Sequence, residues 1–271
     1  MEPSVRTAVI SDIHGNLEAF GTVLDDIANR NVDEIICLGD ILGYGPNPVE
    51  CADLVAEKCS FSLMGNHDYA VLYEPTNFNE AAKRAAFWTR KQIELAGKAD
   101  PETGTNRLEF LNRLKVRWKY LEHYTCVHGT VRRPINEYLF ATDPIDNPLK
   151  VEQIFDRIEE RCLVGHTHVP GIFTVEPEFY RAEELGNRDE DDPTHAGRHE
   201  FVEGEKAIMN PGSVGQPRDH DPRASYAILE TGEKHYADFY RIEYDIETVA
   251  NKIHESEELD PWLAERLFKG M

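Results

Sequence analysis

The stretch Thr7-Ala8-Val9-Ile10-Ser11-Asp12-Ile13-His14-Gly15-Asn16 decides the fold. Its first four residues are β-branched or apolar, which predicts a short strand that ends before Asp12 and His14. Asn16 can cap a helix, because apolar residues follow it at helical spacing, at Leu17, Phe20, Val23, Leu24 and Ile27. A strand that leads into an amphipathic helix is the first half of a strand–helix–strand unit.

The same alternation continues downstream. Residues 34–38 form the second predicted strand, a helix opens at Pro46 or Pro48, and residues 61–64 form the third strand. We therefore expect a βαβαβ unit with a parallel or mixed sheet. Later strand-like runs follow one another at short gaps, which favours antiparallel pairing, at residues 120–127, 161–164, 171–175, 207–209, 224–229 and 235–240.

Three segments depart from this alternation. Residues 69–118 carry Ala, Lys, Arg, Glu and Leu at helical spacing, with a break at Pro101-Glu102-Thr103-Gly104, and predict a helical insertion. Residues 176–206 are rich in acids and poor in hydrophobic residues, which predicts a solvated loop. A C-terminal helix is predicted from Ile246. The length of 271 residues allows one large or two small domains, and a hydrophobic content of 41% is ample for a buried core; we expect residues 1–271 to form a single domain.

Charge and cysteine content exclude some classes of protein. The chain has 50 acidic and 29 basic residues, so its formal net charge is −21. Broad binding to nucleic acid or to a membrane surface through a basic face is therefore excluded. No apolar run is long enough for a signal peptide or a membrane span. The five cysteines are odd in number and are expected to be reduced, so we expect a cytoplasmic protein of undetermined oligomeric state.

Five apolar runs end in residues that can bind a metal. Residues just beyond strand ends meet in one crevice of an open α/β sheet. The set offers two carboxylates, one amide oxygen and four imidazoles, which suit divalent first-row metals better than calcium or structural zinc. Seven ligands exceed the need of one ion, so we expect two ions about 3.5–4 Å apart, as in phosphoryl-displacement sites. The candidate ligands are Asp12, His14, Asp40, Asn66, His128, His166 and His168.

Each fragment by itself has a simpler explanation. A lone Asp-x-His occurs often by chance, and a lone Gly-His-x-His, as at residues 165–168, is more often a turn. The occurrence of all five in order behind apolar runs favours a metal centre. The remaining histidines lack this context and are expected to be surface or structural residues: His123, His195, His199, His220, His235 and His254.

The sequence resembles the calcineurin-like metallophosphoesterase family. The matching motifs are Asp12-Ile13-His14, Gly39-Asp40, Gly65-Asn66-His67-Asp68, Val127-His128-Gly129, Gly165-His166-Thr167-His168 and the later loop at residues 210–218. The resemblance implies an α/β (α+β) fold, a four-layer αββα sandwich of two mixed β-sheets flanked by helices, with a dimetal site at the strand ends. It also implies that one ion is held by Asp12, His14, Asp40 and His168, and the other by Asp40, Asn66, His128 and His166, with Asp40 as the bridge.

The resemblance further implies a reaction. A metal-bound hydroxide attacks the phosphorus of a phosphomonoester or phosphodiester, and His67 protonates the leaving oxygen as the general acid. Asp68 is expected to orient His67, and a carboxylate neighbour would raise the pKa of that imidazole. Manganese is the first choice for the two divalent ions, with iron, zinc, nickel, cobalt or magnesium as alternatives.

Each candidate contact to the substrate has two interpretations. Asn66 and His67 face the substrate by the resemblance, and Ser213 lies in a segment, residues 210–215, that can form either an anion nest or a tight turn. Arg218 and Arg223 can bind phosphate or pair with local aspartates. Weaker candidates for phosphate binding are Arg132 and Arg133. The helical insertion can cap the site or simply pack over the sheet edge, and its candidate cations are Lys83, Arg84, Arg90 and Lys91.

Two departures from the family pattern indicate which branch of the family the chain resembles. Gly43-Tyr44-Gly45 stands where phosphoprotein phosphatases carry Asp-Arg-Gly, and Asp68 replaces their Glu. Both favour the bacterial or archaeal phosphodiesterase-like branch and a small phosphate-ester substrate. The alternatives are a catalytically weak or inactive binding or scaffold protein of the same fold, a dinucleotide polyphosphate hydrolase and a nuclease. The net charge of −21 disfavours the nuclease.

Overall fold

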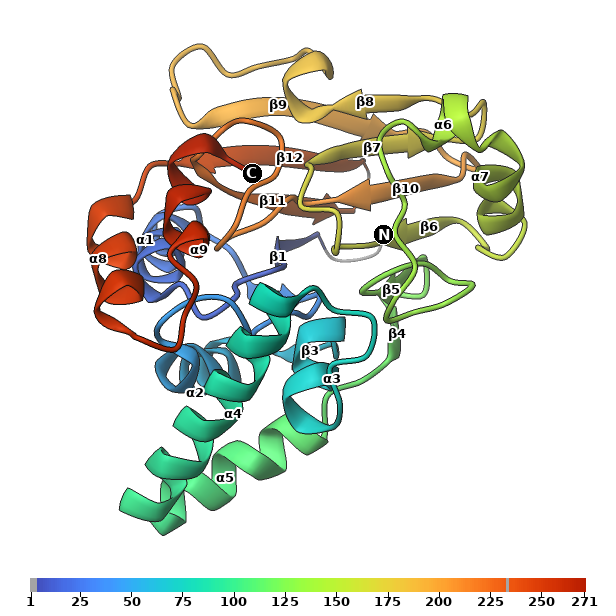
Figure 1. Cartoon of the computed structure of the whole chain (residues 1–271). Helices are drawn as coiled ribbons and strands as arrows, with labels where there is room; N and C mark the ends of the chain where they lie inside the picture. The colour runs from blue at the N-terminus through green and yellow to red at the C-terminus, as the bar shows by residue number, and fades with distance from the viewer. Residues whose placement is uncertain (1–3, 233) are drawn as a thin grey trace.

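A computed structural model of the chain describes residues 4–232 and 234–271. Within them the strands form two six-stranded mixed sheets (Figure 1). The first sheet has the order β3 (Phe61–Ser62), β2 (Glu34–Cys37), β1 (Val5–Ile10), β11 (Ala224–Thr231), β12 (His235–Ile242) and β9 (His195–Phe201). The second has the order β4 (Arg117–Tyr120), β5 (Tyr124–Val127), β6 (Arg161–Leu163), β10 (Ala207–Asn210), β7 (Gly171–Thr174) and β8 (Phe179–Arg181).

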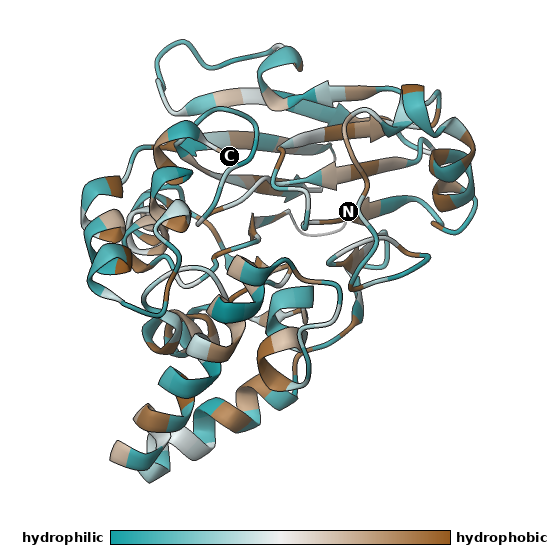
Figure 2. Cartoon of the chain, viewed as in Figure 1, coloured by the Kyte–Doolittle hydropathy of each residue, from teal (hydrophilic) through white to brown (hydrophobic). Residues whose placement is uncertain are grey.

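Helices lie on the outer faces of both sheets. Among the described residues they are α1 (Leu17–Ala28), α2 (Pro48–Lys58), α3 (Asn66–Leu72), α4 (Glu80–Ala99), α5 (Pro101–Asn112), α6 (Asp143–Asp146), α7 (Pro148–Phe155), α8 (Ile246–Glu255) and α9 (Trp262–Glu265). Short 3₁₀ turns occupy Ala182–Glu184 and Leu267–Lys269. In Figure 2, α4 and α5 alternate between teal and brown along their lengths, as helices with one buried face do.

Three hydrophobic cores explain the layers. Val9 of β1 packs between the sheets with residues such as Met209 of β10, whereas its neighbours Ala8 and Ile10 belong to the core under α1 and α2. This division follows from the alternation of side chains along a strand. A third core covers the outer face of the second sheet, where Ile154 of α7 packs. The predicted four-layer αββα sandwich is thus confirmed.

The N-terminal unit forms as the sequence predicts. β1 pairs in parallel with β2, and β2 in parallel with β3. The side chain of Asn16 caps α1 by accepting a hydrogen bond from the Ala19 amide at 3.1 Å. Proline begins α2 at Pro48, where the missing N–H costs the helix nothing. These parallel connections bring the ends of β1, β2 and β3 to one edge of the first sheet.

Residues 117–127 form two strands, whereas the sequence predicted one strand over residues 120–127. They form an antiparallel hairpin of β4 and β5. Leu121 and Glu122 take left-handed backbone conformations, with φ of 45° and 56°, and reverse the chain between the two strands. The helical insertion accordingly ends at Asn112, before β4. The predicted break in the middle of the insertion is confirmed. α4 ends at Ala99, and Pro101 begins α5 after Asp100 caps that helix through the Thr103 amide at 3.2 Å.

The prediction of a loop over residues 176–206 is wrong for β8 and β9. β9 extends the edge of the first sheet beside β12. Few hydrophobic residues are needed there, because the buried Asp238 of β12 accepts hydrogen bonds from Arg198 at 2.6 Å and pairs with His195 at 3.0 Å. A charged network therefore supports this strand. Residues 189–193 of the acidic segment do lie outside any strand.

Two further findings concern the described residues. The five cysteines carry no disulfide, and all but Cys59 are buried. None of the described helices combines the length and the apolar character that crossing a membrane requires.

Candidate metal centre

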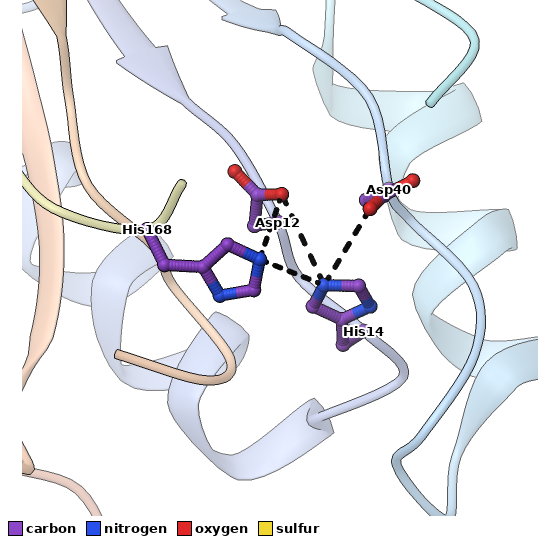
Figure 3. A group of neighbouring side chains, drawn as sticks. All are labelled: Asp12, His14, Asp40 and His168. Carbon is purple, nitrogen blue, oxygen red and sulfur yellow. Dashed lines mark hydrogen bonds and ion pairs between the residues drawn. The ribbon is translucent and has the colours of Figure 1, made fainter. Parts of the chain in front are cut away.

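The seven predicted ligands lie together where strands of both sheets end. Asp12 and His14 follow β1, and Asp40 follows β2. Asn66 begins α3 after β3, while the other three ligands follow β5 and β6 of the second sheet. The ligand atoms form two buried sets within which all atoms lie within 4.8 Å of one another: Asp12, His14, Asp40 and His168, and Asp40, His128 and His166. Figure 3 shows the first set. Asp40 belongs to both.

Asn66 joins the second set through its side-chain oxygen. Asn66 Oδ1 lies 3.3 Å from His128 Nε2. The same imidazole nitrogen lies 3.3 Å from Asp40 Oδ2, and in the first set His168 Nε2 lies 3.2 Å from Asp12 Oδ1. The structure therefore places a carboxylate, an amide oxygen and imidazole nitrogens around one point, as the strand-end pattern predicts.

The backbone at these positions is held in an unusual conformation. Asp12, His14, Asp40, His166 and His168 have positive φ, between 50° and 69°. Residues with a side chain avoid this left-handed region, at a cost of about 1–3 kcal/mol each. Such strain persists where the surrounding structure fixes it, and it gathers at functional sites. Turns of this kind aim successive ligands from one strand end into the crevice.

Backbone carbonyls determine which nitrogen of each histidine carries the proton. His14 Nδ1 lies 3.1 Å from the Leu42 carbonyl, His128 Nδ1 lies 3.0 Å from the Leu38 carbonyl, and His168 Nδ1 bonds the Gln216 carbonyl. A carbonyl only accepts, so in each ring Nδ1 donates its proton. In the neutral rings Nε2 then presents a lone pair to the cluster. Metal-binding histidines are oriented in this way.

The donor set fits a divalent cation. His14 Nε2 and His168 Nε2 face each other at 3.3 Å, with a lone pair on each in the neutral state. Among the described residues, the buried atoms Asp12 Oδ1 and His166 Nε2 have no hydrogen-bond partner. Buried acceptors that face one another repel unless a cation lies between them. The residues themselves therefore indicate a metal at this place.

Burial and neighbouring charges set the protonation of the ligands. Burial raises the pKa of Asp40, but the His128 and His67 imidazoles outweigh it and hold the pKa well below its usual range. Burial lowers the pKa of His14 and of His166 well below the usual value. For His128, burial is overcome by Asp40, which raises the pKa to about 9. Ionised carboxylates and mostly neutral imidazoles are the forms that bind metal, and His128 must release its proton to do so.

Comparison with known proteins assigns the family. The sequence model of the calcineurin-like phosphoesterases matches residues 5–249. The chain belongs to this family. It is 39% identical, over 273 aligned residues and 97% of each chain, to an uncharacterized protein of the archaeon Methanocaldococcus jannaschii.

Solved structures of similar proteins agree with this assignment. A crystal structure of a metallophosphoesterase from Sphaerobacter thermophilus is 33% identical, with a TM-score of 0.79 over 99% of this chain and 100% of that one. A hypothetical protein from Pyrococcus horikoshii shares the fold at 18% identity, with a TM-score of 0.71 over 98% of this chain and 99% of that one. The predicted calcineurin-like family and its bacterial or archaeal branch are confirmed.

In this calcineurin-like phosphoesterase, His67 lies buried beside the metal ligands. Its ring contacts those of His14, Tyr44 and Phe78, with centroids 4.8, 4.3 and 4.6 Å away. Its backbone amide donates to Asp40 Oδ1 at 2.8 Å. Burial is the main cause that lowers its pKa to about 4; Asp40 opposes this effect, and Arg218 adds to it. The prediction of a raised pKa is therefore wrong.

Asp68 has a different role from the predicted one. Its carboxylate accepts hydrogen bonds from the backbone amides of Asp40 at 2.9 Å, Leu42 at 3.0 Å and Gly65 at 3.0 Å. In the described chain no hydrogen bond joins it to the His67 ring, so the prediction that Asp68 orients His67 is wrong. It fixes the loop that carries Asp40. Burial, and then the Asp40 charge, raise the pKa of Asp68 above its usual value.

The loop at residues 210–215 is a tight turn rather than an anion nest. The Ser213 hydroxyl donates to the Asp12 carbonyl at 2.8 Å and accepts from the Gln216 amide. The Val214 and Gly215 amides donate to the carbonyls of Ser11 and Asp12. These donors hold the backbone of a ligand and are not directed at a substrate, so the prediction of Ser213 as a substrate contact is wrong.

The candidate arginines divide between structural and site positions. Arg223 pairs with Asp221 at 2.5 Å, and Arg132 pairs with Glu137 at 3.3 Å, so both are structural. Arg218 remains at the site, where its guanidinium lies 5.9 Å from the centre of the Tyr44 ring. Arg133 lines a cleft that adjoins the centre.

Of the two alternatives for the insertion, three of its four candidate cations fit packing rather than a cap. Arg90 donates to the carbonyl of Val71 at the end of α3, and Lys91 pairs with Glu258 at 2.6 Å. Arg84 lies 3.8 Å from Asp260. Arg90 thus joins α4 to the end of α3, and the other two side chains join α4 to the segment between α8 and α9. The loop before α4 is a part of the insertion that borders the centre.

Sequence reasoning missed the aromatic residues of the site. Tyr44 contacts His14 and His67, and Phe78 also contacts His67. Tyr138 stacks on His166, with ring centroids 3.7 Å apart. Phe78 and Tyr138 lie in loops, where no strand-end pattern marks them. For Tyr44, one feature of the sequence could have indicated a place at the site: its position within the altered Gly43-Tyr44-Gly45 motif.

Proposed function

We propose that the protein hydrolyses a small phosphomonoester or phosphodiester with two divalent metal ions, manganese first among them. The observation that carries this proposal is the pair of buried ligand sets that share Asp40. By the ligand geometry, Asp12, His14, Asp40 and His168 would hold one ion, and Asp40, Asn66, His128 and His166 the other. Bound ions of this kind attract phosphate oxygens and lower the pKa of water.

Charge balance supports an anionic substrate at this place alone. Asp12 and Asp40 contribute two negative charges to the sets, and two divalent ions would contribute four positive ones. The site would then carry a local excess of two positive charges in a chain of net charge −21. A small phosphate ester is drawn to such a site, whereas a long polyanion is repelled by the rest of the surface.

His67 is the candidate proton donor for the leaving oxygen. It is 4% exposed, borders the cleft and is held by the bond from its amide to Asp40. Its Nδ1 is buried without a hydrogen-bond partner among the described residues. An anionic substrate bound beside the ring favours the protonated form and so opposes the effect of burial on its pKa. The proton would then pass to the oxygen that leaves phosphorus.

Arg218 is the candidate contact to the remaining phosphate oxygens. Its guanidinium donates to Gln216 Oε1 at 2.9 Å and pairs with no carboxylate of the described chain. It lies close enough to lower the pKa of both His67 and His168. A cation without a carboxylate partner beside the metal ligands is well placed for an anionic substrate.

A hydrolysis panel tests the proposal. Metal-free protein is supplied in turn with Mn²⁺, Mg²⁺, Co²⁺, Ni²⁺ and Zn²⁺ and assayed on a phosphomonoester, a phosphodiester and a dinucleotide polyphosphate. Metal-dependent turnover of at least one substrate, lost in Asp12→Asn, is the expected result. Absence of turnover with every metal, in protein shown to bind two ions per chain, would favour the scaffold alternative. We also propose a cytoplasmic location, which the five unbridged cysteines support.

A further inference from the structure

A cleft of about 580 Å³ opens directly beside the metal centre. Asn66, His67 and His166 form its inner end, so whatever occupies it lies next to the candidate reacting atoms. Its outer walls come from two loops, residues 76–79 before α4 and residues 133–136 and 138 after β5. Sites that bury a ligand of drug or nucleotide size have about 300–1,000 Å³. The space therefore far exceeds that of a phosphate group alone.

The inner part of the cleft has aromatic walls. Tyr138 stacks on the His166 ring, with centroids 3.7 Å apart and an interplanar angle of 21°. Phe78 packs against His67 with centroids 4.6 Å apart. Both aromatic side chains are only partly buried and face the cleft. Flat aromatic surfaces held in this way bind planar rings by stacking.

The outer part of the cleft presents side-chain amides. Asn77 and Asn136 are exposed, and neither side chain hydrogen-bonds to another residue of the described chain. Each amide offers both a donor and an acceptor. This is the pairing that asparagine uses to bind the edge of a nucleobase. A purely apolar ligand would leave these groups unsatisfied.

The charge of the cleft is the opposite of that of the molecule. Although 50 of the 271 residues are acidic, none of the described residues that line the cleft is Asp or Glu. Arg133 lines it, and within the described ranges its guanidinium has no hydrogen bond and no ion pair. The neighbouring Arg132, by contrast, pairs with Glu137. An unpaired arginine in a wall without carboxylates favours an anionic ligand.

We propose that this cleft receives the nucleoside of a nucleotide substrate. The base stacks on the aromatic wall of Phe78 and Tyr138, and Asn136 and Asn77 bind its polar edge. Arg133 neutralises phosphate charge that the metal centre does not reach. This inference rests on the proposed function, because it names the substrate class of the same site.

A matched pair of diesters tests the proposal. The para-nitrophenyl esters of thymidine monophosphate and of methyl phosphate share the reacting bond and the leaving group. The metal-loaded enzyme should show a kcat/KM about 10–100-fold higher on the thymidine ester, the usual worth of one stacked base. Phe78→Leu, which keeps apolar volume but removes the ring, and Asn136→Ala should each reduce this ratio. Phe87→Leu, an exposed phenylalanine on α4 outside the cleft, should leave it unchanged.

Calorimetry supplies a readout that does not depend on turnover. Thymidine monophosphate should bind the metal-loaded protein more tightly than inorganic phosphate, and Phe78→Leu should remove most of the difference. A kcat/KM ratio near one together with equal affinities for the two ligands would overturn the nucleoside assignment and leave the phosphoesterase proposal standing. Tight, Phe78-dependent nucleotide binding without hydrolysis of either ester would support the nucleoside assignment. It would overturn the proposed reaction for diesters and leave the phosphomonoester, which the hydrolysis panel tests separately.

Discussion

At the scale of single residues, the positions of the ring protons on the ligand histidines decide which nitrogen faces the cluster. His14, His128 and His168 each direct Nδ1 at a backbone carbonyl, which leaves Nε2 as the free face of each neutral ring. Spacing in the sequence predicted that these rings would meet. It could not predict their tautomers, because each ring bonds a carbonyl that lies far from it in the sequence. The carbonyls belong to residues 42, 38 and 216 for His14, His128 and His168, respectively.

Asp40 is the residue on which the two ligand sets depend. Asp40→Asn removes the charge shared by both sets, so we expect it to abolish most activity and to lower metal content. Asp68→Asn disturbs only the amide hydrogen bonds that hold the Asp40 loop, and such supporting residues are usually worth about 10–100-fold. Steady-state kinetics with metal analysis on both variants compare the two losses. Equal losses in activity would show that the assignment of Asp40 as the bridge is wrong.

His67 can be separated from the metal ligands by the choice of leaving group. His67→Gln should retain both metals, yet lower kcat on an alkyl ester by about 10²–10⁴-fold, the usual worth of general acid catalysis. A nitrophenolate leaves without much help, so the loss on an aryl ester should be smaller. The measurement is kcat on an aryl and an alkyl ester of the same phosphate, with metal content determined in parallel. The same loss on both esters would leave His67 with an orienting role only.

Sequence reasoning at this scale failed where the direction of a side chain mattered. The family resemblance implied that Asp68 orients His67. Both lie in the first turn of α3, where neighbouring side chains point about 100° apart, and the Asp68 carboxylate turns to the backbone amides of residues 40, 42 and 65. Ser213 likewise turns to the backbone of Asp12.

At the scale of elements, β9 shows how a strand can form without a hydrophobic pattern. Its sequence, His-Ala-Gly-Arg-His-Glu-Phe, lacks the alternation that marks β1, and only its pairing with β12 reveals it. The stabilising contacts come from Asp238, which is 3% exposed and distant in sequence. Local composition therefore predicts a loop, and tertiary ion pairs override it.

The ion pairs of Asp238 give a pH-dependent prediction. Burial raises the pKa of Asp238, but hydrogen bonds from His195 and Arg198 lower it below the usual 3.8. A lowered pKa in the folded state adds stability above about pH 4 and loses it as the pH falls towards the folded value. Asp238→Asn should therefore lower the free energy of unfolding by about 1.5–3 kcal/mol at neutral pH, the worth of a charged hydrogen bond.

Urea unfolding from pH 7 down to pH 3 measures this effect. The difference between wild type and Asp238→Asn should shrink below about pH 4, because the wild-type carboxylate then begins to take up a proton. Asp25→Asn, an exposed position on α1, serves as the control and should change little. A difference that stays constant over the whole range would show that packing, not charge, connects β9 to β12.

At the scale of the whole molecule, the site exists because two sheets end at one edge. The first sheet supplies Asp12, His14 and Asp40, and the second supplies the histidines after β5 and β6. The order of motifs along the chain predicted this convergence. The cleft was not predicted, since it is made by loops at residues 76–79 and 133–138 whose positions depend on the packing of α4 and on the turn after β5. Substrate preference therefore resides in the parts that sequence patterns describe least.

Metal binding should stabilise the folded chain as a whole, because the ligands come from both sheets and converge only when these have packed together. A ligand that binds only the folded state at 100 times its Kd adds about 2.7 kcal/mol. For a chain of this size that corresponds to a rise in Tm of about 5–10 °C. Thermal unfolding with Mn²⁺ and with a chelator measures the difference. In Asp12→Asn the rise should be smaller, because one of the four ligands of the first set has lost its charge, whereas Asp25→Asn should respond as the wild type does. A Tm that is the same with Mn²⁺ and with the chelator would contradict a metal centre that joins the two sheets.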